Sequence, residues 1–416
     1  MPSSASWAGA YHRLAATIPA KVAAARLTMG GFIACVDART DLAQATALFA
    51  PDAPPRAAAL GAALVDRVRR GVGGEMLFPW PDGAAWLAAH LDLACSLGGT
   101  GAQAAWVLSS IGAPAAMSLG DRSTHMLAQL PPDILVVDGD RLVRCRDLAA
   151  RGERVGDIYI FDFSAGVPVA GVLPPRSSRI IVRLADPGLD VDPDFDRVTP
   201  GLAATAGAGL ISGFHAIPAE DLAAGIERVG GLCRRWSGAG LHLIHMEMAG
   251  YETMERMETV LDAFSGVVTS IGMSHSELRQ IAPGVDTPAA MRTIAERTRV
   301  SRLCVHADEW AASVTRGDPD REREALMSGS LLAAARAEAG APVATVAVPA
   351  AAHFAPPPFD GGPLGDGWHL VAVSTPYLSH PVTTLGLGDS FTGGCLLVLG
   401  AAQQDQAAAR KDPTCT

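Results

Sequence analysis

Apolar and polar positions follow two periods along this chain, one typical of helices and one typical of strands. The segment 20–27 has helical spacing, and the apolar run 28–36 that follows predicts a first strand ending at Asp37. Further helices are predicted over 54–70, 80–93 and 104–111. Short strand-like runs at 134–137, 142–145 and 158–163 predict a small sheet.

The second half of the chain alternates strands and helices. The pattern predicts helices over 218–236, 253–264, 276–282 and 321–339, and strands over 241–248, 267–271, 302–306, 343–348 and 369–373. Such alternation favours a parallel sheet with helices on both faces and right-handed crossovers. The sequence therefore predicts an α/β fold.

Composition narrows the class of protein. The 416 residues are 49% hydrophobic and 18% charged, which allows a sizeable core, and the net charge of −10 argues against nucleic acid or an anionic membrane as a partner. Seven cysteines are dispersed without metal-binding spacing, as in a reduced cytosolic protein. With no signal-peptide pattern and no apolar run of membrane-spanning length, we expect a soluble cytoplasmic protein, as a monomer or small homo-oligomer.

The stretch 383–394, TTLGLGDSFTGG, carries the most chemistry. Gly386 and Gly388 allow close approach of a ligand to the backbone, and the start of the apolar helix behind them leaves amide N–H groups free for a phosphate. A carboxylate repels phosphate, so Asp389 makes sense there as a base that takes a proton from an attacking hydroxyl. The alternative, that Asp389 merely caps a core helix, has roughly even odds from these residues alone.

Two acids at strand ends are candidates for a Mg²⁺ site, because Mg²⁺ keeps several waters and takes few carboxylates. Glu247 lies in His-Met-Glu at 245–247, and Glu277 lies in SIGMSHSE at 270–277. Glu277 could equally be an acid in the first turn of an ordinary helix. His306 ends a later strand, and a core histidine is its favoured interpretation.

A second glycine-rich segment lies at 97–103, LGGTGAQ, ahead of an apolar helix. Only small residues let a backbone approach a ligand closely, so Gly98 and Gly99 are candidates for contact with a substrate. A glycine-rich helix start without a ligand is a fair alternative.

The ordered set of motifs resembles one known family. Pro381 and TTLGLGD at 383–389 resemble the ADP-dependent sugar kinases (glucokinase and phosphofructokinase) of the ribokinase-like superfamily, and further matches run in the same order from Gly31 to Gly394. The resemblance implies a three-layer α/β/α domain with a smaller β-sheet lid. The chain would be one kinase unit, 1–416, with the large domain mainly at 186–416 plus N-terminal parts and a discontinuous lid within about 35–75 and 130–185.

The resemblance also implies residue roles. Asp389 would be the catalytic base, with amides of Gly386, Leu387 and Gly388 and the side chain of Arg179 on the phosphates. Asp37, Gly98 and Gly99 would hold the sugar, and Glu247 and Glu277 would organise Mg²⁺. ADP as donor comes from the branch resembled and from no residue, so ATP stays open.

Residues near the expected acceptor favour an unphosphorylated sugar such as glucose. Glu75 stands where this chain resembles the acid-bearing site of the glucokinases, and Ser164 and Ala165 occupy places that are basic in the phosphofructokinases. A carboxylate near a sugar phosphate would cost about 1–4 kcal/mol per close charge pair. A phosphofructokinase, a kinase for another sugar or a nucleoside with ATP, or a non-catalytic binding relative remain alternatives, since Ile33, Cys35, Thr100 and Ser274 depart from the family pattern.

Overall fold

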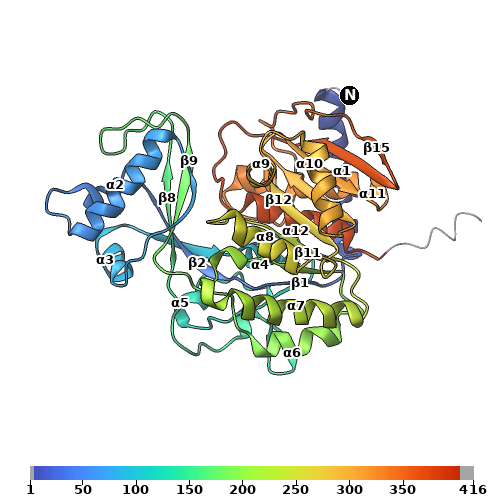
Figure 1. Cartoon of the computed structure of the whole chain (residues 1–416), viewed down its shortest axis with the longest axis horizontal. Helices are drawn as coiled ribbons and strands as arrows, with labels where there is room; N and C mark the ends of the chain where they lie inside the picture. Colours follow the sequence, from blue (N-terminus) through green and yellow to red (C-terminus); the bar gives the residue numbers. More distant parts are fainter. Residues whose placement is uncertain (1–3, 403–416) are drawn as a thin grey trace, which may run out of the picture.

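The computed structural model describes residues 4–402, which form two sheets (Figure 1). The large sheet has the strand order β15-β16-β14-β13-β12-β11-β10-β1-β5-β6-β7. Its strands are β1 Thr28–Gly30, β5 Ala115–Met117, β6 Leu135–Asp138, β7 Arg141–Arg144, β10 Ala208–Ile211, β11 Ile244–Glu247, β12 Ser270–Ser274, β13 Arg302–His306, β14 Trp310–Thr315, β15 Gly362–Gly365 and β16 Trp368–Ser374.

The centre of the large sheet is parallel, from β6 through β5, β1, β10, β11 and β12 to β13. Both edges are antiparallel, with β7 on one side and β14, β16 and β15 on the other. A parallel strand must be covered on both faces, which is why β10 reads as a continuous apolar run and is buried throughout. The carboxyl ends of the parallel strands therefore share one edge of the sheet.

Helices cover both faces of the large sheet. Those that pack with one core cluster are α6 Pro193–Leu202, α7 Leu222–Gly238, α8 Met254–Ala263, α9 His275–Ile281 and α10 Thr287–Arg297. Those of the other face are α1 Ser4–Ala23, α4 Thr100–Ser110, α11 Pro319–Ala339 and α12 Leu387–Leu399. The short helix α5 Thr124–Leu127 follows β5. The result is the three-layer α/β/α arrangement that the sequence predicts.

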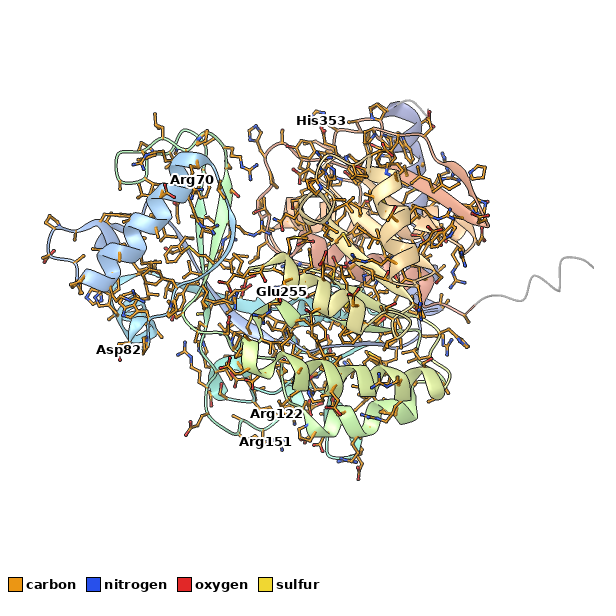
Figure 2. The ribbon with its side chains drawn as sticks, in the orientation of Figure 1. Arg70, Asp82, Arg122, Arg151, Glu255 and His353 are labelled. Carbon is orange, nitrogen blue, oxygen red and sulfur yellow. The ribbon has the colours of Figure 1, made fainter. Side chains whose placement is uncertain are left out.

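The small sheet stands beside the large one (Figure 1) and has the order β3-β9-β8-β2-β4. Its strands are β2 Cys35–Asp41, β3 Gly74–Leu77, β4 Ala94–Gly98, β8 Ile158–Phe163 and β9 Ser178–Arg183, and it packs with α2 Pro55–Arg70 and α3 Gly83–His90. Alternate residues of β8, Tyr159, Phe161 and Phe163, are buried in this second core. In Figure 2, Arg70 and Asp82 mark this side of the molecule and His353 marks the part around the large sheet.

Several elements differ from the sequence-based prediction. The single strand predicted over 28–36 is two strands, with β1 in the large sheet and β2 in the small one, so Asp37 lies inside β2 and not at a strand end. The runs at 134–137 and 142–145 were expected in the small sheet, but β6 and β7 pair as a hairpin on the large sheet because β6 also pairs with β5. No strand forms over 343–348. The strand β14 and helices α6 and α10 were not predicted.

Two further expectations can be compared with the described residues. No helix among residues 4–402 is long and apolar enough to cross a membrane. The six cysteines in this part of the chain are free thiols, while Cys415 lies outside it.

Candidate active site

The turn that opens α12 favours glycine at position 386. Gly386 has φ 69°, and a Cβ there would lie 2.4 Å from the guanidinium carbon of Arg336. A side chain would be strained by the left-handed conformation and would force the Arg336 guanidinium to move. Among residues 4–402, no acceptor takes the backbone N–H of Leu387 or Gly388, so both amides are free at the start of α12.

Asp389 lies in the first turn of α12, where it accepts a hydrogen bond from Thr100 at the start of α4. Burial raises the pKa of its carboxyl, while the charge of Arg336, the Thr100 bond and the charge of Arg179 oppose that shift. The charge of Glu247 adds to the rise in this pKa. Positive and negative charges thus both act on the Asp389 carboxyl, which lies next to the free amides of Leu387 and Gly388.

Asp37 shares this field. The side chain is buried, and Cys35 Sγ donates to Asp37 Oδ1 over 3.6 Å. Burial raises the pKa of Asp37 to about 7, helped by the negative charge of Asp389 and opposed by the Cys35 bond and by Arg179 and Arg336. The structure therefore brings Asp37, Asp389 and Arg179 into one cluster, although they come from two strands of the small sheet and from α12.

The glycine-rich turn at 98–101 fits tightly around β2. A Cβ on Gly98 would lie 2.2 Å from Asp37 Oδ1, and one on Gly99, at φ 90°, would lie 2.3 Å from the carbonyl oxygen of Ile33. These two glycines are thus explained by packing around Asp37 and β2. Contact of either glycine with a substrate stays a prediction.

Arg179 reaches from the small sheet to the segment ahead of α12. Its Nη1 donates to Thr384 Oγ1 over 3.0 Å, while its Nε is buried without a hydrogen-bond partner in the described part of the chain. On β8, Asp162 lies opposite Arg179 in the register and forms an ion pair with Arg39. One side of the Arg179 fork is therefore still free to take an anion.

Glu247, at the carboxyl end of β11, is held by three donors. His245 Nε2 lies 2.9 Å and Thr392 Oγ1 3.0 Å from Oε2, and His306 Nε2 lies 3.3 Å from Oε1. Burial alone would raise the pKa of Glu247, but the hydrogen bonds from both histidines, followed by their charges, outweigh it and lower the pKa to about 2. Glu247 is thus a permanent anion.

His306 is therefore more than a packed core histidine. Burial alone would lower its pKa, but the hydrogen bond and charge of Glu247, followed by the charge of Glu277, raise the pKa to about 9. His306 also lies close to the α12 turn, since a Cβ on Gly388 would be 3.1 Å from its Cε1. Glu247 ends the strand two before β13 in the sequence, and an acid at that place could have identified His306 as its partner.

Glu277 forms a capping box at the start of α9. The N–H of Ser274 donates to Glu277 Oε2 over 2.7 Å, and the N–H of Glu277 donates to Ser274 Oγ over 3.3 Å. Burial raises the pKa of Glu277, and the charges of Glu247 and His306 act on it. The helix-start interpretation is therefore present in the structure, and a metal role is an additional proposal.

These acids fit a Mg²⁺ ion only through its waters. Every carboxylate oxygen of Glu247 already accepts a hydrogen bond, and Glu277 keeps only Oε1 without a bond in the described part of the chain. Mg²⁺ retains several waters, which such acids can orient. Direct coordination by Glu247 would require the loss of one of its donors.

Glu75 is paired with two side chains and is not a free acid. Its Oε1 lies 2.5 Å from Arg183 Nε and its Oε2 lies 3.2 Å from His215 Nε2, while Arg183 also pairs with Asp186. Burial alone would raise the pKa of Glu75, but the charge and hydrogen bond of His215, followed by those of Arg183, lower it. The charges of Asp37 and Glu75 both raise the pKa of the Cys35 thiol, so Glu75 acts on the same part of the site as Asp37.

Sequence reasoning missed Arg336, Thr100 and Thr384. Arg336 is 3% exposed and stands alone as a cation in the Ala-rich stretch 333–339. A single charged residue on the buried face of a helix is the signal that could have found it, because a buried charge needs a partner.

The fold and this cluster define a ribokinase-like kinase. A family model described as "ADP-specific Phosphofructokinase/Glucokinase conserved region" matches residues 56–354. The chain belongs to this family of ADP-dependent sugar kinases. No curated protein matches it.

Solved structures share the fold at low identity. An "ADP-dependent kinase complex with fructose-6-phosphate and ADPbetaS" matches with TM-score 0.78 and 16% identity, over 98% of this chain and 100% of that one. A last common ancestor of ADP-dependent phosphofructokinases from Methanosarcinales has TM-score 0.71 and 16% identity, over 97% and 100%. A phosphofructokinase from Pyrococcus horikoshii with AMP has TM-score 0.71 and 16% identity, over 90% and 98%.

Proposed function

We propose that this protein transfers the terminal phosphoryl group of ADP to a hydroxyl of an unphosphorylated sugar such as glucose. The observation that carries the proposal is the meeting of Asp389, the free amides of the α12 turn and Arg179 at one place. A base beside an anion site is what phosphoryl transfer to a hydroxyl needs.

In this mechanism the sugar hydroxyl gives its proton to Asp389 as its oxygen attacks the terminal phosphorus. The bond from that phosphorus to the bridging oxygen breaks, and AMP leaves. The amides of Leu387 and Gly388 and the Arg179 guanidinium hold the charge on the transferred group. Mg²⁺, when bound, would neutralise phosphate charge, with Glu247 and Glu277 holding its waters in place.

The environment of Glu75 supports an acceptor without a phosphate. Arg183 and His215 lie on this side of the site, and the Glu75 carboxylate contacts both. Asp37 adds a second acid beside Cys35. A sugar phosphate needs cations that are free to pair with it, whereas sugar hydroxyls can bond to carboxylates.

A side-by-side coupled assay tests the proposal. Purified protein with Mg²⁺ is given ADP or ATP and glucose, fructose 6-phosphate or a nucleoside. We expect turnover with ADP and glucose, at a kcat/KM at least tenfold above that for fructose 6-phosphate. Preference for fructose 6-phosphate would overturn the acceptor assignment, and preference for ATP would overturn the donor.

A phosphofructokinase is the second candidate. Solved phosphofructokinases share the fold, and Arg183 could reach a sugar phosphate if it left Glu75. The same assay decides between the two acceptors.

A further inference from the structure

We propose that Arg336 is a second phosphate-binding arginine, which holds the transferred phosphoryl group from the α11 side while Arg179 holds it from the small sheet. The proposal rests on the proposed function, because it assigns another residue to the same site. The assignment is based on the placement of the Arg336 guanidinium.

The guanidinium lies directly under the α12 turn. A Cβ on Gly386 would be 2.4 Å from Arg336 Cζ and 2.5 Å from both Nη1 and Nη2, so the fork lies against the backbone that precedes the free amides. Nη1 donates to Ser390 Oγ over 3.2 Å, one turn into α12. The Arg336 guanidinium carbon also lies 5.4 Å from the centre of the Trp106 ring on α4.

The fork is incompletely bonded although the side chain is only 3% exposed. Nε is buried without a partner, and Nη2 makes no hydrogen bond within residues 4–402. A buried N–H that stays unbonded is costly, so the free Nε of Arg336 suits an incoming acceptor. The oxygens of a phosphoryl group match the geometry of a guanidinium fork.

A second arginine of the same helix shows what a purely structural role looks like. Arg321 Nη2 donates to three carbonyl oxygens at the far end of α12, those of Val398, Leu399 and Ala401. Those bonds close the end of a helix. Arg336 instead lies in the field of Asp389, Asp37 and Arg179.

The direct test compares ADP with AMP, because AMP lacks the transferred phosphoryl group. Calorimetry on Arg336→Met is expected to show ADP binding weakened about tenfold or more, with AMP binding within about twofold of the unmodified protein. Arg321→Met, the matched control, should leave both affinities unchanged while lowering the melting temperature. Equal losses for ADP and AMP, or no loss for ADP, would overturn the proposal.

Turnover gives a second readout. In the coupled assay, Arg336→Met should lower kcat about 10²–10³-fold, the size expected for one lost donor to a developing oxyanion, and added guanidinium should restore part of it. If Arg336→Met does not fold, Arg336→Lys decides, because it keeps the charge and loses the fork. That variant should bind ADP at least about fivefold more weakly, and unchanged ADP affinity in it refutes the proposal.

The two proposals fail in distinguishable ways. If the unmodified protein turns over no sugar, the proposed function fails, yet the ADP-against-AMP comparison still decides whether Arg336 binds the terminal phosphate. If the unmodified protein is active and the Arg336 variants match it, only the assignment of Arg336 is wrong.

Discussion

Arg179 of the small sheet donates a hydrogen bond over 3.0 Å to Thr384, two residues ahead of the glycine that opens α12. Thr384 therefore joins the small sheet to the segment ahead of α12, and Arg179 Nε stays free beside it. The bond gives the small sheet a means to place a cation over the phosphate site.

Gly386→Ala should damage both folding and activity. The added Cβ meets the Arg336 guanidinium at 2.4 Å and φ is 69°, so we expect the free energy of unfolding to fall by about 2–4 kcal/mol and turnover to be lost. Gly139→Ala is the matched control, because φ is 60° and nothing lies within 4 Å of its Cβ. It should cost only about 1 kcal/mol, measured by urea unfolding. Equal costs at both positions would show that contact with Arg336 is unimportant.

Activity should fall on the acid side of neutrality. The pKa of Asp37 is raised to about 7, so this carboxyl gains a proton as the pH falls below 7, and the raised pKa of Asp389 makes that carboxyl gain its proton at a higher pH than an ordinary aspartate. Because a base must be ionised to accept a proton, the pH profile should have an acidic limb, in which kcat/KM drops about tenfold for each pH unit.

Asp37→Asn identifies the origin of this limb. It removes the carboxyl whose pKa is raised to about 7, so a limb that comes from Asp37 should disappear from the pH profile. The groups acting on Asp389 are Arg336, Glu247, Thr100 and Arg179, and none of them changes in this variant. An unmodified protein that is fully active at pH 5 would contradict the prediction.

Stability should decline as the pH rises from about 6.5 to 9. The folded pKa of His306 is about 9, against an ordinary value of 6.5, so its stabilising charge is fully present below pH 6.5 and is lost as the pH passes through 9. We expect about 1–3 kcal/mol of unfolding free energy to disappear over this window. His306→Gln should flatten the curve between pH 6.5 and 9, and an unchanged slope in urea titrations would show that His306 is not charged in the folded state.

Removing the Glu75 carboxylate should shift acceptor preference. Glu75→Ala frees Arg183 and His215, so we expect kcat/KM for glucose to fall at least tenfold and the ratio of fructose 6-phosphate to glucose to rise. Glu255→Ala is the control, since Glu255 is an exposed acid in the first turn of α8 (Figure 2). A variant that retains the glucose preference would show that Glu75 does not determine acceptor specificity.

The sequence was informative where a local pattern decides the structure. The strand 302–306 and the helix start near Gly386 follow from apolar runs and glycine placement, and the structure has both. The acids Asp37, Glu247 and Asp389 could be named because a carboxylate next to a strand or a glycine turn is unusual.

The rest of the fold and site could not be predicted, because it depends on contacts between segments far apart in the sequence. The change from β1 to β2 takes place within 31–34, where nothing in the apolar pattern marks a move to another sheet. The hairpin β6–β7 joined the large sheet through β5, a partner too short to predict. Arg336 and Thr100 reach the site only because α11, α4 and α12 pack together, and no spacing in the sequence records that contact.

The central claim is that Asp389 takes the proton from the acceptor, and Asp389→Asn tests it most directly. The variant keeps the shape of the side chain and the free amides of the α12 turn, so ADP should still bind while kcat falls about 10²–10⁴-fold. Asp320→Asn, an exposed acid in the first turn of α11, is the control and should leave kcat unchanged. Calorimetric binding of ADP with turnover lost is the result predicted; turnover near that of the unmodified protein would contradict the account.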